Sequence, residues 1–401
     1  MKIAVVTQTF PVREQPYRGH SVYQTLLRLR KLATVNVYSP QATYPSWLHA
    51  TSRTWAKTDL SYSPELLNAQ YFSYPAVPVL SRPVNGLLCA RKLEPFLKKN
   101  PPDVILSYWV YPDGFSAVHV GRKLGVPVVV KAIGSDVNHA SDAVSATLVQ
   151  YVLNRANRVL TVSEHLRGKV IGNGVAPAKV ITVVNGCDTS IFCNADREKA
   201  RRELGILPDT NLVLYVGRFD LAKGLRELLR ATSNLVEKFP SLQLAMVGDG
   251  PAAAELARLA RTLGLTGRVI FVPACSSRDV ARWMAAATLC TLPSYREGCP
   301  SVVLEALSSG RAIVATAVGG IPELVTDDSA ILVPSRDAVA LTEGIRSALE
   351  RSWDSVEISR RMGRGWDDVA RETFDVCQNV LHEHRSRGSQ TLAQLHTGTH
   401  A

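Results

Sequence analysis

The sequence predicts two doubly wound α/β domains, each built on a parallel β-sheet. Three observations lead to this fold class. The chain has 401 residues, which is more than a single hydrophobic core normally serves. Short runs rich in β-branched residues alternate with amphipathic segments, and the alternation occurs once in each half of the chain. Such alternation indicates βαβ units, whose parallel strands are covered by helices on both faces.

The first half contains five apolar runs that predict strands and three amphipathic segments that predict helices between them. The strands are expected at 2–7, 33–39, 103–108, 127–132 and 158–163, and the helices at 21–32, 114–125 and 142–156. Residues 45–100 alternate poorly and are rich in Pro and Tyr, so they predict a long loop with helical pieces. One of these pieces, 85–99, is a basic amphipathic segment.

The second half predicts strands at 211–217, 242–248, 268–273, 289–293, 312–316 and 330–334, separated by helices. The break between the domains is expected near 179–192, where a strand ends in an Asn-Gly turn and no helix follows at once. The predicted domains are therefore 1–185 and 186–367, with a helix at about 368–385 that returns to the first domain. The tail, 386–401, lacks apolar periodicity and predicts disorder. Because ligands bind beyond the carboxyl ends of parallel strands, we expect the two sheets to face a central cleft.

The composition is that of an ordinary globular protein, with 46% hydrophobic and 20% charged residues. No apolar run reaches the roughly 18–20 residues that a membrane-spanning helix needs. The first ten residues predict a buried strand rather than a signal peptide. The seven cysteines form no CxxC pair, which favours reduced thiols in a cytoplasm over a disulfide framework or a metal site.

The net charge of +11 belongs to the first half of the chain. Residues 1–185 hold 21 Lys and Arg against 9 Asp and Glu, whereas residues 186–401 hold 25 against 26. Two interpretations stay open: docking to an anionic membrane surface or polysaccharide, through 85–99 and 26–32, or a merely soluble surface. Docking would place the protein at the inner face of a membrane. Nucleic acid is not expected as a partner, because the basic residues are not interleaved with aromatic residues in a known module.

A glycine-rich turn follows the predicted strand 211–217. Gly217, Arg218 and Lys223 stand there, ahead of a predicted helix, so free backbone amides and two cations can bind a diphosphate. Basic residues in such turns are more often simply solvated. The later sequence VGDGP, 247–251, resembles part of a dinucleotide fingerprint but lacks its third glycine. A tight turn into a helix explains it better than a nicotinamide-dependent oxidoreductase does.

The segment YREGCPSVVLEALSSG, 295–310, contains two glutamates, Glu297 and Glu305. Pro300 suits the first position of a helix that ends near Gly310, so Glu297 lies on a loop and Glu305 more than one turn inside the helix. The amides around Gly298 point at a site where an anion can bind. A solvated position at the helix start explains Glu297 well but explains Glu305 poorly, because the surrounding helix is apolar.

Residues 293–325 resemble the E-x7-E signature of the retaining nucleotide-sugar glycosyltransferases of family 4, which have the GT-B fold. The sequences YPDG, VVNGCDTSIF, VGRFDLAKGL and VGDGP stand in the order usual for that family. The resemblance implies transfer of a sugar from a nucleoside diphosphate sugar to a glycan or lipid-linked acceptor, with retained anomeric configuration. It also implies a role in cell-surface polysaccharide or glycolipid biosynthesis, and no need for a metal or cofactor.

The resemblance also implies roles for individual residues. Arg218 and Lys223 would bind the donor diphosphate, Glu297 the hydroxyls of the donor sugar, and Glu305 the ribose diol. Further donor contacts are implied for Gly217, Gly298, Cys299, Pro300, Ser301, Gly319 and Gly320, and for Val272 near the base. Pro273 stands where a glycine is usual, which leaves the identity of the base open.

The acceptor is implied to lie on the first domain, near Gly19 and His20 after the first strand. Asp136 and His139 are further candidates on this side, although Asp136 also suits a helix N-cap and a lone histidine is more often a capping or surface residue. Ile133 stands where many relatives have a histidine near the donor sugar. A non-catalytic nucleotide-sugar-binding subunit therefore stays open as an alternative.

Overall fold

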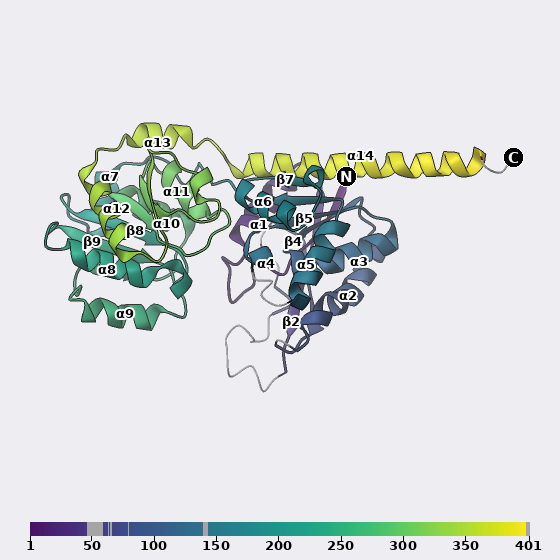
Figure 1. Ribbon diagram of the computed structural model, residues 1–401, viewed down its shortest axis with the longest axis horizontal. Coiled ribbons are helices and arrows are strands. Elements are labelled where there is room, and N and C mark those ends of the chain that lie inside the picture. Colours follow the sequence, from purple (N-terminus) through teal and green to yellow (C-terminus); the bar gives the residue numbers. More distant parts are fainter. Residues whose placement is uncertain (46–58, 63, 65, 79, 139–142, 398–401) are drawn as a thin grey trace. The chain divides into compact units, whose positions relative to one another are not determined.

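The computed structural model describes residues 1–45, 59–62, 64, 66–78, 80–138 and 143–397. The chain divides into two units, each with one sheet and its covering helices (Figure 1). Unit 1 contains residues 1–184 and 366–401, and unit 2 contains residues 185–365. The predicted boundaries, 185/186 and 367/368, lie within two residues of this division.

Unit 1 is built on a parallel sheet of seven strands in the order β3-β2-β1-β4-β5-β6-β7. The strands are β1 Lys2–Val6, β2 Thr34–Thr43, β3 Ala69–Pro75, β4 Val104–Tyr108, β5 Val128–Ala132, β6 Arg158–Thr161 and β7 Val180–Thr182. β1 lies between β2 and β4, because Ile3 pairs with Val35 on one side and with Val104 on the other. All residues of β4 and β5 are buried, including Ser107 and Lys131, as expected for central strands that are covered on both faces.

Most helices of unit 1 lie between successive strands of its sheet, and the last helix follows unit 2 in the chain. The helices are α1 His20–Leu29, α2 Asn85–Lys99, α3 Phe115–Leu124, α4 Ser135–Asn138, α5 Ala143–Arg155, α6 Glu164–Gly172 and α14 Trp366–Thr397, with short turns at Arg82–Val84, Val110–Gly114 and Pro177–Lys179. The prediction of a continuous loop with helical pieces over 45–100 was wrong at β3. This strand lies at the edge of the sheet, where Pro75 is tolerated because an edge strand forms fewer ladder hydrogen bonds.

Unit 2 is built on a parallel sheet of six strands in the order β10-β9-β8-β11-β12-β13. The strands are β8 Asn211–Val216, β9 Leu242–Val247, β10 Val269–Val272, β11 Leu289–Leu292, β12 Ile313–Thr316 and β13 Ala330–Val333. The helices are α7 Arg197–Leu204, α8 Leu225–Leu235, α9 Ala253–Thr262, α10 Ser277–Ala286, α11 Ser301–Ser308, α12 Ala338–Glu350 and α13 Ser355–Arg361, with short turns η6 Leu221–Lys223 and η7 Ile321–Glu323. All six predicted strands of this half are present.

The last helix, α14, completes the core of unit 1. It packs against α1 and β4, and Trp366 and Cys377 join Ile3, Leu26 and Leu106 in one apolar cluster. The predicted disorder of 386–401 was wrong as far as Thr397, because α14 continues to that residue. Extending an existing helix costs little, and Gln, Leu and Ala in this segment are good helix formers. Residues 398–401 lie outside the described residues.

We predict that Trp366→Ala lowers the free energy of unfolding of the protein by about 3–5 kcal/mol, because the indole is only 2% exposed within the core of unit 1. Urea denaturation followed by circular dichroism measures the change. Gln378→Ala, on the exposed face of the same helix, is the control and should change it by less than about 0.5 kcal/mol. Equal effects of the two substitutions would show that α14 is not part of this core.

Candidate functional site

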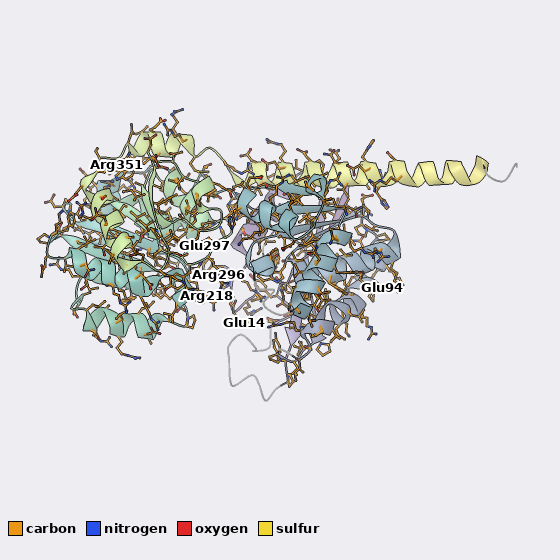
Figure 2. The ribbon with its side chains drawn as sticks, viewed as in Figure 1. Glu14, Glu94, Arg218, Arg296, Glu297 and Arg351 are labelled. Carbon is orange, nitrogen blue, oxygen red and sulfur yellow. The ribbon has the colours of Figure 1, made fainter. Side chains whose placement is uncertain are left out.

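The strand order of unit 2 reverses between β8 and β11. After β8 the chain builds β9 and β10 on one side of the sheet, and then it returns to build β11, β12 and β13 on the other side. Loops that leave two such neighbouring strands diverge, so the crevice at their carboxyl ends is the usual binding site in doubly wound sheets. Arg218 and Lys223 follow β8, and Glu297 follows β11. Figure 2 labels Arg218 and Glu297. The topology therefore brings these three predicted residues to one place.

Lys223 and Glu297 form an ion pair across this switch point. The Lys223 ammonium donates to Oε1 of Glu297 at 2.6 Å, and the two side chains are 30% and 11% exposed. Asp220 caps the turn η6, because its side chain accepts from the backbone amide of Ala222 at 3.0 Å. Lys223 thus projects from a fixed turn. An ammonium has three donors, so Lys223 can bind an anion while it still contacts Glu297.

Two glycines let the surrounding loops approach the Glu297 segment. Gly319 has a φ of 58°, and a Cβ at this position would lie 1.9 Å from the carbonyl oxygen of Glu297. Gly224 has a φ of 68°, and a Cβ there would lie 2.0 Å from the carbonyl oxygen of Pro293. Any side chain at either position would displace the loop that carries Glu297. The predicted Gly319 therefore acts on the site through its lack of a side chain.

Backbone hydrogen bonds complete the fixation of this loop. The amide of Tyr295 donates to the carbonyl of Ala222 at 2.9 Å, and the amide of Gly320 donates to the carbonyl of Gly298 at 3.0 Å. Cys299 is buried, and its carbonyl accepts from the side chain of Asn185 at 2.9 Å. The loops after β8, β11 and β12 therefore form one hydrogen-bonded unit.

Helix α11 begins at Ser301, one residue later than predicted, with Pro300 as its N-cap. Glu305 lies in the second turn of this helix. Although the residue is partly exposed, protein atoms surround its carboxyl group, and this desolvation raises its pKa to about 7. The oxygens of this carboxyl group can accept hydrogen bonds from the hydroxyls of a ligand.

The remaining candidates of unit 2 lie at the same edge of the sheet. The Arg218 side chain is exposed, and its carbonyl accepts from the Tyr215 hydroxyl at 2.9 Å. The amide of Gly217 donates to the carbonyl of Val247 at the end of β9. Val272 ends β10, and its carbonyl accepts from the amide of Gly248. The sequence VGDGP is thus a turn that packs against the loop after β8, as the tight-turn interpretation predicts.

In unit 1, the predicted candidates lie at the carboxyl ends of β1 and β5. Gly19 is the N-cap of α1, and His20 is the first residue of that helix. The Asp136 carboxylate is buried and accepts from the backbone amides of Val110, Ile133 and Gly134 at 2.9–3.1 Å. Asp136 therefore holds the turn after β5, and its carboxylate is not presented to a ligand. His139 lies outside the described residues.

Asp113 is a buried residue to which the sequence analysis assigned no role. Its Oδ2 accepts from the amide of Gln8 at 2.7 Å, so it ties the loop after β1 to the loop after β4, where the strand order of unit 1 reverses. Burial raises the pKa of Asp113 to about 8. The only signal in the sequence was the family motif YPDG, which does not reveal that its aspartate is buried.

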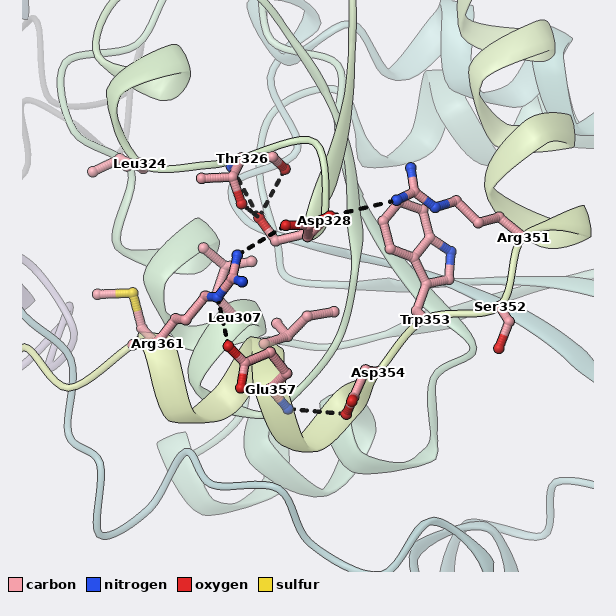
Figure 3. A pocket seen from close by; sticks show the side chains of 13 residues that line it. Leu307, Leu324, Thr326, Asp328, Arg351, Ser352, Trp353, Asp354, Glu357 and Arg361 are labelled. Atoms are coloured by element: carbon pink, nitrogen blue, oxygen red, sulfur yellow. Dashed lines mark hydrogen bonds and ion pairs between the residues drawn. The ribbon is translucent and has the colours of Figure 1, made fainter.

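A separate pocket of about 490 Å³ lies in unit 2 between α11, the end of α12 and α13 (Figure 3). Its charged groups are paired with one another. Asp328 contacts Arg361 at 3.0 Å and Arg351 at 3.9 Å, and Asp354 caps α13. None of the predicted site residues lines this pocket. The Lys223–Glu297 cluster is therefore the stronger candidate.

Two family models match the chain. One is described as "Glycosyl transferases group 1" and matches residues 196–365, and the other is described as "Glycosyl transferase 4-like domain" and matches residues 19–186. Among curated relatives, the D-inositol 3-phosphate glycosyltransferase of Frankia alni is 32% identical over 70% of this chain and 74% of its own length. The D-inositol 3-phosphate glycosyltransferase of Nocardioides sp. is 35% identical, but the match spans only 50% of that relative. The putative teichuronic acid biosynthesis glycosyltransferase TuaC of Bacillus subtilis is 28% identical over 88% of this chain and 90% of its own length.

Solved structures resemble the protein over nearly its full length. Alr3699/HepE of Anabaena, in complex with UDP and glucose, aligns with a TM-score of 0.74 at 18% identity, over 94% of this chain and 100% of that protein. The sucrose-phosphate synthase of Thermosynechococcus elongatus aligns with a TM-score of 0.72 at 21% identity, over 98% and 100%. At these identities the likeness shows a common fold.

We predict that Glu305→Gln stabilises the protein increasingly as the pH rises from about 4.5 to 7. The carboxyl holds its proton more tightly in the folded than in the unfolded protein, so the wild type loses stability across this interval and the amide does not. The gain in the free energy of unfolding should reach up to about 3 kcal/mol and stay constant above pH 7. Urea denaturation at several pH values measures it. Glu198→Gln, at an exposed position, is the control, and a gain that does not change with pH would contradict the buried state of Glu305.

Proposed function

Because the chain belongs to the glycosyltransferases of family 4, which have the GT-B fold, we propose that it transfers a sugar from a nucleoside diphosphate sugar to a hydroxyl group of a glycan or lipid-linked acceptor. The observation that carries this proposal is the Lys223–Glu297 ion pair at the switch point of unit 2. A diphosphate needs cations, and the hydroxyls of a sugar need hydrogen-bond acceptors. The pair supplies one of each within 2.6 Å.

We assign the donor contacts by chemistry. Lys223 and Arg218 bind the diphosphate, and their positive charge stabilises the negative charge that grows on it as the bond to the sugar breaks. Glu297 accepts hydrogen bonds from hydroxyls of the transferred sugar, and its pairing with Lys223 fixes the sugar relative to the diphosphate. Glu305 accepts from the ribose diol. The amides at the start of α11 add a partial positive charge at the phosphate end.

We propose that the transfer retains the anomeric configuration. The bond from the anomeric carbon to the diphosphate breaks, and the bond to the acceptor oxygen forms on the same face of the sugar. The proton of the acceptor hydroxyl passes to the departing diphosphate, so no enzymic nucleophile is required. In this scheme Arg218, Lys223 and the N-terminus of α11 stabilise the negative charge of the departing diphosphate, so no metal ion is required. We therefore expect full turnover in the presence of EDTA.

The relatives suggest which substrates to test first. HepE was crystallised with UDP and glucose, so a UDP-sugar is the first donor to examine. TuaC is named for teichuronic acid biosynthesis, and the Frankia relative is named for D-inositol 3-phosphate. Anionic, hydroxyl-rich acceptors of this kind match the excess of Lys and Arg in residues 1–185. We propose cell-surface polysaccharide or glycolipid biosynthesis in the cytoplasm as the context.

We further propose that α2 contacts an anionic membrane surface. Arg91, Lys92, Lys98 and Lys99 are exposed on this helix, although Lys98 also pairs with Glu94 at 2.6 Å, and the apolar residue Leu93 is buried in unit 1. The contact would therefore be electrostatic and peripheral. The other segment, 26–32, is less suitable, because Arg30 contacts the carbonyl of Leu66 and Lys31 contacts Asp367. Among the described residues, no helix combines the length and apolarity needed to cross a bilayer.

We predict that Lys223→Ala and Glu297→Ala each reduce transfer by about a hundredfold or more, because each removes one half of the pair that holds the donor. Transfer of radiolabelled sugar from UDP-glucose and other nucleotide sugars measures the effect. Lys238→Ala is the matched control: Lys238, in the turn after α8, also forms a 2.6 Å ion pair with a glutamate, Glu350 at the end of α12. The control should keep wild-type transfer.

Two other outcomes would contradict this proposal. Unchanged transfer in either variant would refute the role of that residue. A wild-type protein whose melting temperature rises with a nucleotide sugar, but which neither transfers nor hydrolyses it, would support the non-catalytic binding subunit instead.

We predict that the protein sediments with vesicles of phosphatidylglycerol but not of phosphatidylcholine, and that 0.5 M NaCl releases it, because the attraction of exposed charges is screened by salt. Replacing Arg91, Lys92, Lys98 and Lys99 with Gln should abolish sedimentation. Gln substitutions at four exposed arginines of unit 2, at positions 230, 258, 261 and 360, serve as the control. Binding that resists salt, or that survives the α2 substitutions, would exclude this surface.

A further inference from the structure

Arg336 occupies an unusual backbone conformation beside the candidate site. It follows β13 in the turn to α12, with a φ of 63°, in the left-handed region that glycine prefers. The next residue, Asp337, caps α12 by accepting from the amide of Ala340 at 2.8 Å, so the turn itself is well fixed. A glycine would adopt this turn without strain. An arginine here is therefore of interest for what its side chain does.

The Arg336 side chain stacks on Tyr295. Its guanidinium carbon lies 4.4 Å from the centre of the tyrosine ring, which is the geometry of a cation–π contact. Tyr295 stands two residues before Glu297, on the loop after β11. The stack thus joins the turn after β13 to the loop that carries one half of the ion pair.

Tyr295 also contacts the turn that carries Lys223, the other member of the ion pair. Its amide donates to the carbonyl of Ala222, the residue before Lys223. Burial raises the pKa of the tyrosine, and the nearby carboxylate of Glu227, in the first turn of α8, raises it further. The backbone and the ring of Tyr295 therefore contact two different segments, the turn that carries Lys223 and the turn after β13. Only the ring contact depends on Arg336.

We propose that Arg336 is a positioning residue, which acts through the ring of Tyr295 to hold the Glu297 loop in register with Lys223. It need not touch the donor. A shift of the loop by a fraction of an ångström would separate Glu297 from Lys223, because their contact is a single 2.6 Å hydrogen bond. The proposed effect on turnover rests on the proposed function, whereas the effect on the loop itself does not.

The test uses Arg336→Gly in the full chain. Glycine suits the left-handed turn, so the melting temperature should stay within a few degrees of the wild type or rise. Turnover of the nucleotide sugar should fall by about tenfold, with KM for the donor changed less than twofold, because misplacement acts on the reacting geometry. Arg336→Lys, which keeps the cation, should recover part of the loss. A purely structural residue would change stability and leave kcat intact.

Two controls make the outcome specific. Arg351 also stacks on an aromatic ring, at 4.2 Å over Trp353, but it lines the separate pocket of Figure 3, so Arg351→Ala should leave turnover unchanged. Tyr295→Leu should reproduce the loss, and adding Arg336→Gly to it should cause little further loss, because the two residues act in one contact. Additive losses would show that Arg336 acts by another route and would overturn the proposal.

Hydrogen exchange of the free protein separates this proposal from the proposed function. In Arg336→Gly, amides of residues 294–299 should exchange several-fold faster than in the wild type, with the rest of unit 2 unchanged. Unchanged exchange there would overturn the positioning role. If the wild type turns over no nucleotide sugar, the proposed function fails, and the exchange experiment still decides whether Arg336 orders this loop.

Discussion

The candidate site depends on a constraint of parallel sheets, which is that a crevice forms only where two neighbouring strands send the chain in opposite directions. In unit 2 this happens once, between β8 and β11. The charged residues of the candidate site, Lys223 and Glu297, lie on the loops that leave these two strand ends. The ion pair of Lys223 and Glu297 crosses the switch point, and the glycines at 224 and 319 admit the neighbouring loops to backbone contact. The positions of the charged side chains are therefore fixed by main-chain packing.

The sequence predicted the secondary structure correctly in those parts of the protein where the local residue pattern agrees with the fold. All six strands of unit 2 are short apolar runs between turns, and each was predicted. The spacing of Glu297 and Glu305 predicted a loop and a helix, which the structure confirms with a start one residue later. The sequence also predicted that Glu305 is partly buried, because the helix that carries it is otherwise apolar.

What the sequence did not reveal depends on contacts between distant residues. β3 has a proline and no regular alternation, and it is a strand only because β2 offers a partner. Asp136 looks like a polar residue available to a ligand, but three backbone amides from two loops occupy its carboxylate. Arg336 carries no motif at all, since its significance lies in a left-handed turn and in a ring from 41 positions earlier in the chain. Propensity and spacing carry no information on such pairings.

The return of α14 to unit 1 has a consequence for the order in which the protein matures on the ribosome. Unit 2 is encoded between the two parts of unit 1, and its own chain ends at residue 365. The amide of Cys187 donates to the carbonyl of Arg364, so the entry and exit of unit 2 close on one another. Unit 2 can therefore fold as soon as it emerges. Unit 1, although it is synthesised first, waits for Trp366 and Cys377 to fill its core, and until then its sheet exposes an apolar face that a chaperone would recognise.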